Sequence, residues 1–235
     1  MGKSNLTTKQ KKAEINLYII IIVTLIALGI YSIYQNQIIN FSKNKSIHII
    51  LRTMLMAFMQ YSIAGFGITI VSVLRRKSFL SYGLKKKGTL QSIIFSTLIF
   101  IPYVVFLFIT GKANGYLPFQ SVWITKEVLA SVFPVNIIGL AIILIAWGFF
   151  EGFNYVVISE KINIRYPSQN KWLNWGAITC AIMCLLVHGM IGVTPENIIE
   201  AIIVFVSIYG MLMIKEFTDN AWGCVFIFVF LWNAF

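Results

Sequence analysis

The stretch INLYIIIIVTLIALGIYSIY, residues 15–34, runs for 20 residues without a charged side chain. A helix rises about 1.5 Å per residue, so this stretch is long enough to cross the roughly 30 Å hydrocarbon core of a bilayer. It is too long for the apolar region of a signal peptide, and no small-residue cleavage site follows it. We therefore expect a retained first membrane span.

The rest of the chain has the same character. Of its 235 residues, 58% are hydrophobic and only 11% are charged, and the mean hydropathy is +0.82. Such values exclude an ordinary soluble domain. Apolar segments lie at 15–35, 47–74, 89–110, 133–158, 172–191, 197–214 and 220–235. The sequence predicts an all-α integral membrane protein, a polytopic bundle of about seven transmembrane helices.

We divide the chain into an N-terminal two-span segment, residues 1–74, and a membrane core, residues 75–235. No soluble domain fits between the apolar segments. The longest connection, residues 111–132, contains YLPFQSVWITKEVL, whose aromatic and amphipathic pattern predicts a segment that lies along the membrane surface.

The positive charges indicate the orientation. The net charge is +11, but the basic residues occupy short connections and no soluble face gathers them, so we expect no nucleic acid partner. Fourteen of the 19 Lys and Arg residues fall on the side of the N-terminus, and five fall on the other side. The positive-inside rule then predicts a multi-pass protein of the cell membrane, surrounded by lipid, with a cytoplasmic N-terminus. Abundant Ile, Asn and Lys favour a bacterial source.

Two ionisable residues lie inside apolar segments. Glu151 interrupts WGFFEGFNYVV, residues 147–157, and His188 lies in CAIMCLLVHGMIG, residues 180–192. A charged group at the centre of a span costs roughly 2.5–3.5 kcal/mol even on lenient insertion scales, so such residues usually have a function. Helical spacing puts Asn154 and Tyr155 on the same face as Glu151. We predict that these four side chains converge.

Two structural interpretations compete with a reactive site. Gly148 and Gly152 form a G-x-x-x-G pair around Glu151, which would permit close helix packing with a neutral Glu151 hydrogen-bonded to His188. Cys180, Cys184 and His188 follow one helical stripe, but steps of four residues are about 6 Å long, so all three cannot easily reach one metal ion. Reduced cysteines packed as small hydrophobic residues are the favoured interpretation.

The order of several pieces resembles the CPBP family, which comprises CAAX prenyl endopeptidases and bacteriocin-processing or immunity proteins of the Abi type. The resemblance covers residues 75–235. Its parts are a basic loop with SYGLKKKG, then FFEGFNYVV, then CLLVHGM, and finally YGMLMIKEFTDNAWGCVFIFVFLWN. The family has a double Glu in the second part, a His in the third, and a His and an Asn in the last helix.

The resemblance implies that Glu151 and His188 are catalytic and activate a water molecule within the membrane. Asn154 and Tyr155 would support them, and Asn233 would match the Asn of the last helix as an oxyanion or metal contact. It leaves open whether a metal or any other cofactor is bound. Several family positions differ here.

Phe150 replaces the first Glu of the family pair, and Tyr155 stands where the family has Arg. Phe228 or Val229, depending on the alignment, occupies the position of the second His. A general base contributes about 10²–10⁴-fold to a rate and an oxyanion donor about 10²–10³-fold, so these losses bear directly on activity.

Two functions follow from the resemblance. The first is a CPBP-like intramembrane endopeptidase that uses Glu151 and His188 to cleave a peptide or a prenylated-protein type of substrate. The alternative is a catalytically inactive relative, a bacteriocin-immunity or peptide-binding membrane protein.

Overall fold

The computed structural model describes residues 6–113, 115–190 and 192–235, and all regular secondary structure in these ranges is helical. The first half contains α1 (Thr8–Lys43), α2 (Ile49–Ala64), α3 (Phe66–Leu74), the 3-10 helix η1 (Phe79–Tyr82), α4 (Thr89–Ile109) and α5 (Thr125–Leu129). The second half contains α6 (Val135–Ile143), the π-helical segment η2 (Leu144–Phe150), α7 (Glu151–Arg165), α8 (Trp175–Val187), α9 (Pro195–Thr218), α10 (Trp222–Ile227) and the π-helical segment η3 (Phe228–Trp232). The all-helical prediction is confirmed.

Four helices in the described part of the chain are long and apolar enough to cross a membrane. They are α1, α4, the continuous helix 135–165 formed by α6, η2 and α7, and α9. A fifth candidate is α2 with α3, which are bent by 58° relative to one another at Gly65. The two remaining apolar segments form the shorter helices α8 and 222–232. These lengths and compositions identify a multi-pass membrane protein.

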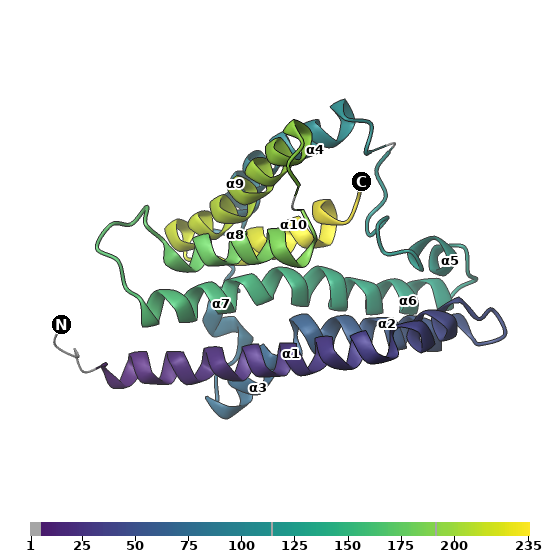
Figure 1. Cartoon of the computed structure of the whole chain (residues 1–235), viewed down its shortest axis with the longest axis horizontal. Coiled ribbons are helices and arrows are strands. Elements are labelled where there is room, and N and C mark those ends of the chain that lie inside the picture. The colour runs from purple at the N-terminus through teal and green to yellow at the C-terminus, as the bar shows by residue number, and fades with distance from the viewer. Residues whose placement is uncertain (1–5, 114, 191) are drawn as a thin grey trace.

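The helices form an open arrangement around the rod of α6, η2 and α7 (Figure 1). On one side α1 packs along α7, and α2 packs against α6 and η2. On the other side α8 packs against α7 and α9, and α9 pairs with α4. Residues from both sides of the division at residue 74 therefore contact each other, and the central rod is shared between them.

Apolar side chains cover much of the outer surface. Most of the residues of α1 between Ile15 and Tyr34 are not buried, and the same holds for the outer face of α4. In a membrane protein these faces contact lipid, since lipid tails solvate them as well as a protein interior would. The buried hydrophobic core extends from Ile20 of α1 to Trp232 of η3. Around α7 it includes Val156, Val157 and all three cysteines, which form no disulfide.

Glycines bring the rod close to the C-terminal helices. A β-carbon added at Gly152 would lie 3.0 Å from the carbonyl oxygen of Cys224, and one at Gly148 would lie 3.2 Å from the α-carbon of Val229. Real β-carbon contacts are rarely so short, so only glycine permits this backbone approach. The G-x-x-x-G pair therefore does serve close packing, against α10 and η3.

The connection between α4 and α6 differs from the surface-lying segment that its sequence suggests. Only α5 is helical, and Phe119, Val122 and Ile124 are buried. The backbone amide of Leu117 donates to the carbonyl of Ala234, at 2.9 Å. Contact with the C-terminal residues of the chain, which sequence periodicity does not report, draws this connection into the protein.

A buried arginine holds the second half of this connection, at α5. Arg52, near the start of α2, is 3% exposed and donates to the carbonyls of Ser42 at 3.2 Å and Ile47 at 3.0 Å. Its guanidinium also forms a bidentate ion pair with the carboxylate of Glu127 in α5. This pairing holds the pKa of Glu127 below its usual range, chiefly through the hydrogen bonds from Arg52.

We expect Gly152→Val to lower the free energy of unfolding by about 1–3 kcal/mol, because the new side chain meets the backbone of α10. Thermal unfolding of the detergent-solubilised protein measures this. The matched control is Gly29→Val in α1, where an added β-carbon has no neighbour within 4 Å. Equal melting temperatures for both variants would contradict the packing described here.

We expect Glu127→Gln to lower the melting temperature at neutral pH. A carboxyl whose pKa is depressed by folding stabilises the fold above its unfolded pKa of about 4.3, and this stabilisation is lost as the pH falls through the lowered pKa. The difference between the wild type and Glu127→Gln should therefore shrink as the pH falls below about 4. Glu196→Gln, in a partly exposed pair with Lys112, should have little effect at any pH. Identical pH dependence of the two variants would refute the role of Arg52.

Candidate functional site

Glu151 begins α7 immediately after the π-helical segment η2 and is 7% exposed. A π-helical turn carries an extra residue, which changes the direction of the side chains that follow it, and such turns are frequent at functional sites. The carboxylate accepts a hydrogen bond from Nε2 of Gln60 at Oε2, over 3.1 Å. Its other oxygen, Oε1, lies 3.4 Å from Nε2 of His188.

His188 follows the last residue of α8 and is the more accessible partner, with its side chain 28% exposed against 9% for Glu151. Its ring meets the ring of Trp232 edge to face, with centroids 5.2 Å apart. Contacts to two different elements, α7 and η3, thus restrict the orientation of the imidazole.

The pair lies in the wall of a cavity of about 350 Å³ between α1, α2, α7 and α8. Its polar lining residues are Thr24, Gln60, Glu151, Asn154, Tyr155 and His188, and its other lining residues are apolar. A volume of this size holds several water molecules or a short stretch of polypeptide. The apolar walls with a few polar groups at one place are typical of a binding site.

The structure brings together Glu151, His188, Asn154 and Tyr155, because all four line this cavity. Tyr155 is buried and its ring stacks on Phe228, with centroids 5.4 Å apart. Cys180 donates from Sγ to the carbonyl of Tyr155 at 3.5 Å, which further ties α8 to α7.

Asn233 lies elsewhere. Its Oδ1 accepts a hydrogen bond from the hydroxyl of Ser121 at 2.8 Å, and its carbonyl accepts one from the amide of the same residue at 3.2 Å. It is not among the residues that line the cavity. The contact between the C-terminal residues and the connection 111–132 accounts for this, since it holds Asn233 against Ser121.

Gln60 is the site residue that sequence reasoning missed. It stands in the apolar stretch MLMAFMQYSIAG, residues 54–65, where an amide has no water to bind. That polarity within an apolar span is the same signal that identifies Glu151, and it could have found Gln60. Thr24, the other polar residue of the wall outside the predicted set, donates to the carbonyl of Ile63 at 3.0 Å.

A metal site has no support from the described residues. Among residues 6–113, 115–190 and 192–235, no group of three or more His, Cys, Asp or Glu side chains is placed to hold an ion. Glu151 and His188 form a group of only two potential ligands.

Comparison with protein-family models, with curated proteins and with solved structures finds no match to this chain. The geometry of the site must therefore carry any functional conclusion.

We expect Glu151→Gln to fold with nearly the stability of the wild type, because an amide of the same shape still accepts from Gln60 and still reaches His188. Glu151→Leu leaves both partners without their acceptor and should cost about 1–3 kcal/mol more. Thermal unfolding of both variants in the same detergent measures the difference. Equal stability of the Leu and Gln variants would mean that the carboxyl group makes no structural contact.

Proposed function

We propose that this protein is an intramembrane hydrolase of the CPBP type, in which Glu151 and His188 activate water for cleavage of a peptide bond. The observation that supports the proposal best is the approach of Glu151 Oε1 to within 3.4 Å of His188 Nε2 in the wall of a 350 Å³ cavity. At this separation both groups can reach one water molecule, which is the arrangement that general acid–base catalysis requires.

The proposed reaction uses the two groups in sequence. The carboxylate of Glu151 accepts a proton from water as the water oxygen bonds to the substrate carbonyl carbon. The resulting tetrahedral intermediate collapses, the carbon–nitrogen bond breaks, and His188 or the newly protonated Glu151 gives a proton to the leaving amine. Asn154, in the same cavity, supplies an amide donor for the negative oxygen of the intermediate.

A second candidate function is binding of a peptide without cleavage, as in an immunity protein. It draws support from the aromatic rings packed behind the site, where Phe228 stacks on Tyr155 and Trp232 packs on His188. The phenyl ring of Phe228 carries no donor or acceptor atom and cannot replace an imidazole as a proton donor or oxyanion contact. Under this proposal Glu151 fixes the orientation of a bound peptide.

Cleavage of peptides in the presence of H₂¹⁸O distinguishes the two functions. The purified protein, reconstituted in vesicles, is incubated with farnesylated peptides and with unmodified apolar peptides, and the products are analysed by mass spectrometry. Hydrolysis places ¹⁸O in a new carboxyl terminus. We expect Glu151→Gln and His188→Ala each to reduce the rate at least about 100-fold, without additivity in the double variant.

The controls make the same chemical changes away from the cavity. Glu196→Gln changes a half-exposed carboxylate, and His48→Ala changes the other histidine of the chain, which caps α2. Both should retain the wild-type rate. Peptide binding without ¹⁸O incorporation would establish the non-catalytic function, and cleavage that persists in Glu151→Gln would exclude Glu151 as the base.

The proposal includes a topology. All seven apolar segments lie in the membrane, α8 and the helix 222–232 as short spans, and the N-terminus and residues 75–88 face the cytoplasm. The six Lys and Arg residues of residues 75–88, with no acidic residue among them, support this orientation.

Labelling with a membrane-impermeant thiol reagent in intact cells tests the orientation. Ser81 and Ala130 are both exposed and lie in connections on opposite sides, and the three native cysteines are buried. We expect labelling of Ala130→Cys and none of Ser81→Cys until the cells are opened. The reverse pattern would invert the topology.

A further inference from the structure

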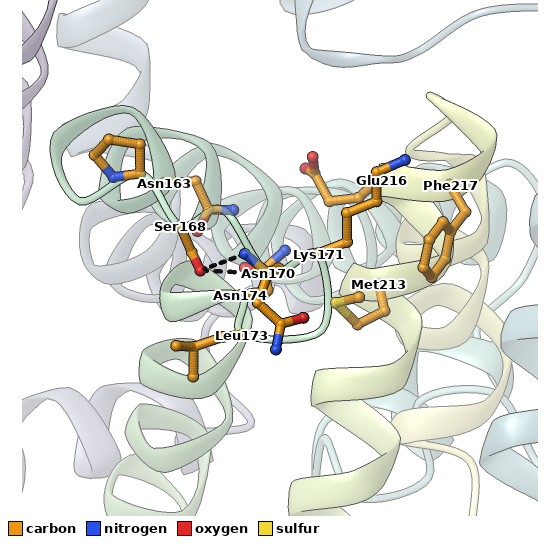
Figure 2. Close-up of a pocket in the computed structure, with 10 residues that line it drawn as sticks. Asn163, Ser168, Asn170, Lys171, Leu173, Asn174, Met213, Glu216 and Phe217 are labelled. Carbon is orange, nitrogen blue, oxygen red and sulfur yellow. Dashed lines mark hydrogen bonds between the residues drawn. The ribbon is translucent and has the colours of Figure 1, made fainter.

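A second cavity, of about 430 Å³, lies at the end of the molecule where α1 begins and where α7 and α9 end (Figures 1 and 2). It is formed by the last turns of α7 and α9 and by the connection between α7 and α8. Figure 2 shows three asparagines, Asn163, Asn170 and Asn174, together with Lys171 and Glu216 around it. It shares no lining residue with the cavity that contains Glu151.

The three asparagines present donors to this cavity. Oδ1 of Asn163 accepts from the backbone amide of Gly176 at 2.8 Å, Oδ1 of Asn174 from that of Ala177 at 2.8 Å, and Oδ1 of Asn170 from that of Trp172 at 3.0 Å. Because a backbone N–H can only donate, these bonds identify which atom of each side-chain amide is the oxygen. The remaining atom of each amide is the NH₂ nitrogen, which is a donor. Three amides thus offer N–H donors.

Asn174 is the most buried of the three asparagines. The residue is only 8% exposed, yet no acceptor for its NH₂ group is found among the residues that the structure describes. Buried polar groups nearly always have a hydrogen-bond partner, from protein, water or ligand. Asn174 lines the cavity, and its NH₂ group is not among the fully buried polar atoms that lack a partner, so it is open to water or to a ligand with acceptor atoms.

The charges favour an anionic acceptor. Glu216 is the one carboxylate among the described residues that line this cavity, and its Oε1 lies 2.8 Å from Nζ of Lys215. The adjacent lysine therefore offsets its charge, and Lys171 adds a cation to the lining. A phosphate group, with several oxygens around one centre, matches donors that approach from several residues.

The surroundings place the cavity at the level of lipid headgroups. Trp172, Trp175 and Phe217 are exposed beside it, and the rings of Trp172 and Phe217 are 5.5 Å apart. Exposed Trp side chains gather at membrane–water interfaces. Leu173, Met213 and Phe217 give the cavity an apolar wall, on which acyl chains can lie.

We propose that this cavity binds the phosphate group of a membrane phospholipid, in the leaflet on the N-terminal side of α1. The amides of Asn163, Asn170 and Asn174 donate to the phosphate oxygens, Lys171 supplies the counter-charge, and the acyl chains leave past Phe217. This site is independent of any hydrolase activity at Glu151.

Native mass spectrometry of the purified full chain tests the proposal. The apparent Kd of the first bound molecule is measured for dioleoyl phosphatidylglycerol, for dioleoylglycerol, which lacks phosphate, and for inorganic phosphate. The key variant is Asn174→Asp, which keeps the oxygen that caps α8 but replaces the donor by a negative charge. We expect it to weaken phosphatidylglycerol binding at least about tenfold, and dioleoylglycerol to bind the wild type at least about tenfold more weakly.

The matched control is Asn136→Asp at the start of α6, where Oδ1 also accepts from a backbone amide but at the opposite end of the rod. It should bind phosphatidylglycerol as the wild type does. Lys171→Glu, an exposed position, provides a second variant with the same expected loss if Asn174→Asp does not fold. Binding of inorganic phosphate with the same dependence on Asn174 would support the phosphate site and assign it to soluble phosphate. Unchanged binding in both variants, or equal binding of dioleoylglycerol, would overturn the proposal.

Discussion

The contact of Glu151 with Gln60 and His188 is the constraint on which the centre of this structure depends. Burying a carboxylate among apolar helices is costly, so neighbouring helices must supply hydrogen-bond partners for it. Gln60 comes from α2 and His188 from the end of α8, and each approaches a different oxygen. Two helices that are far apart in the sequence, α2 and α8, must therefore meet α7 at the position of Glu151.

Close packing on the other face of the rod complements this polar contact. Gly148 and Gly152 let η2 and α7 approach α10 and η3, which brings Phe228 and Trp232 against Tyr155 and His188. The glycines that permit close packing thus also set which aromatic rings lie against two residues of the cavity wall. Close packing and the Glu151–His188 pair are therefore compatible. The rings packed on Tyr155 and His188 are those of Phe228 and Trp232, and neither is a second imidazole.

The sequence predicted the helical class and the apolar segments because uninterrupted hydrophobic runs report membrane helices directly. Helical spacing and the cost of intramembrane polar groups also pointed to one place for Glu151, Asn154, Tyr155 and His188, and these four residues line the same cavity. The sequence did not place Asn233, whose position depends on a contact with Ser121 more than 100 residues away. The bend at Gly65 and the π-helical segments arise from tertiary packing, and a hydropathy profile carries no such information.

Glu151 and His188 interact directly within the folded bundle, and a double-mutant cycle measures that interaction. The free energy of unfolding is determined for the wild type, Glu151→Leu, His188→Ala and the double variant in one detergent at one pH, because the Leu variant removes the acceptor that faces His188. Direct contact predicts a coupling energy of about 0.5–3 kcal/mol between the two positions. Additive effects, with no coupling within error, would contradict the account.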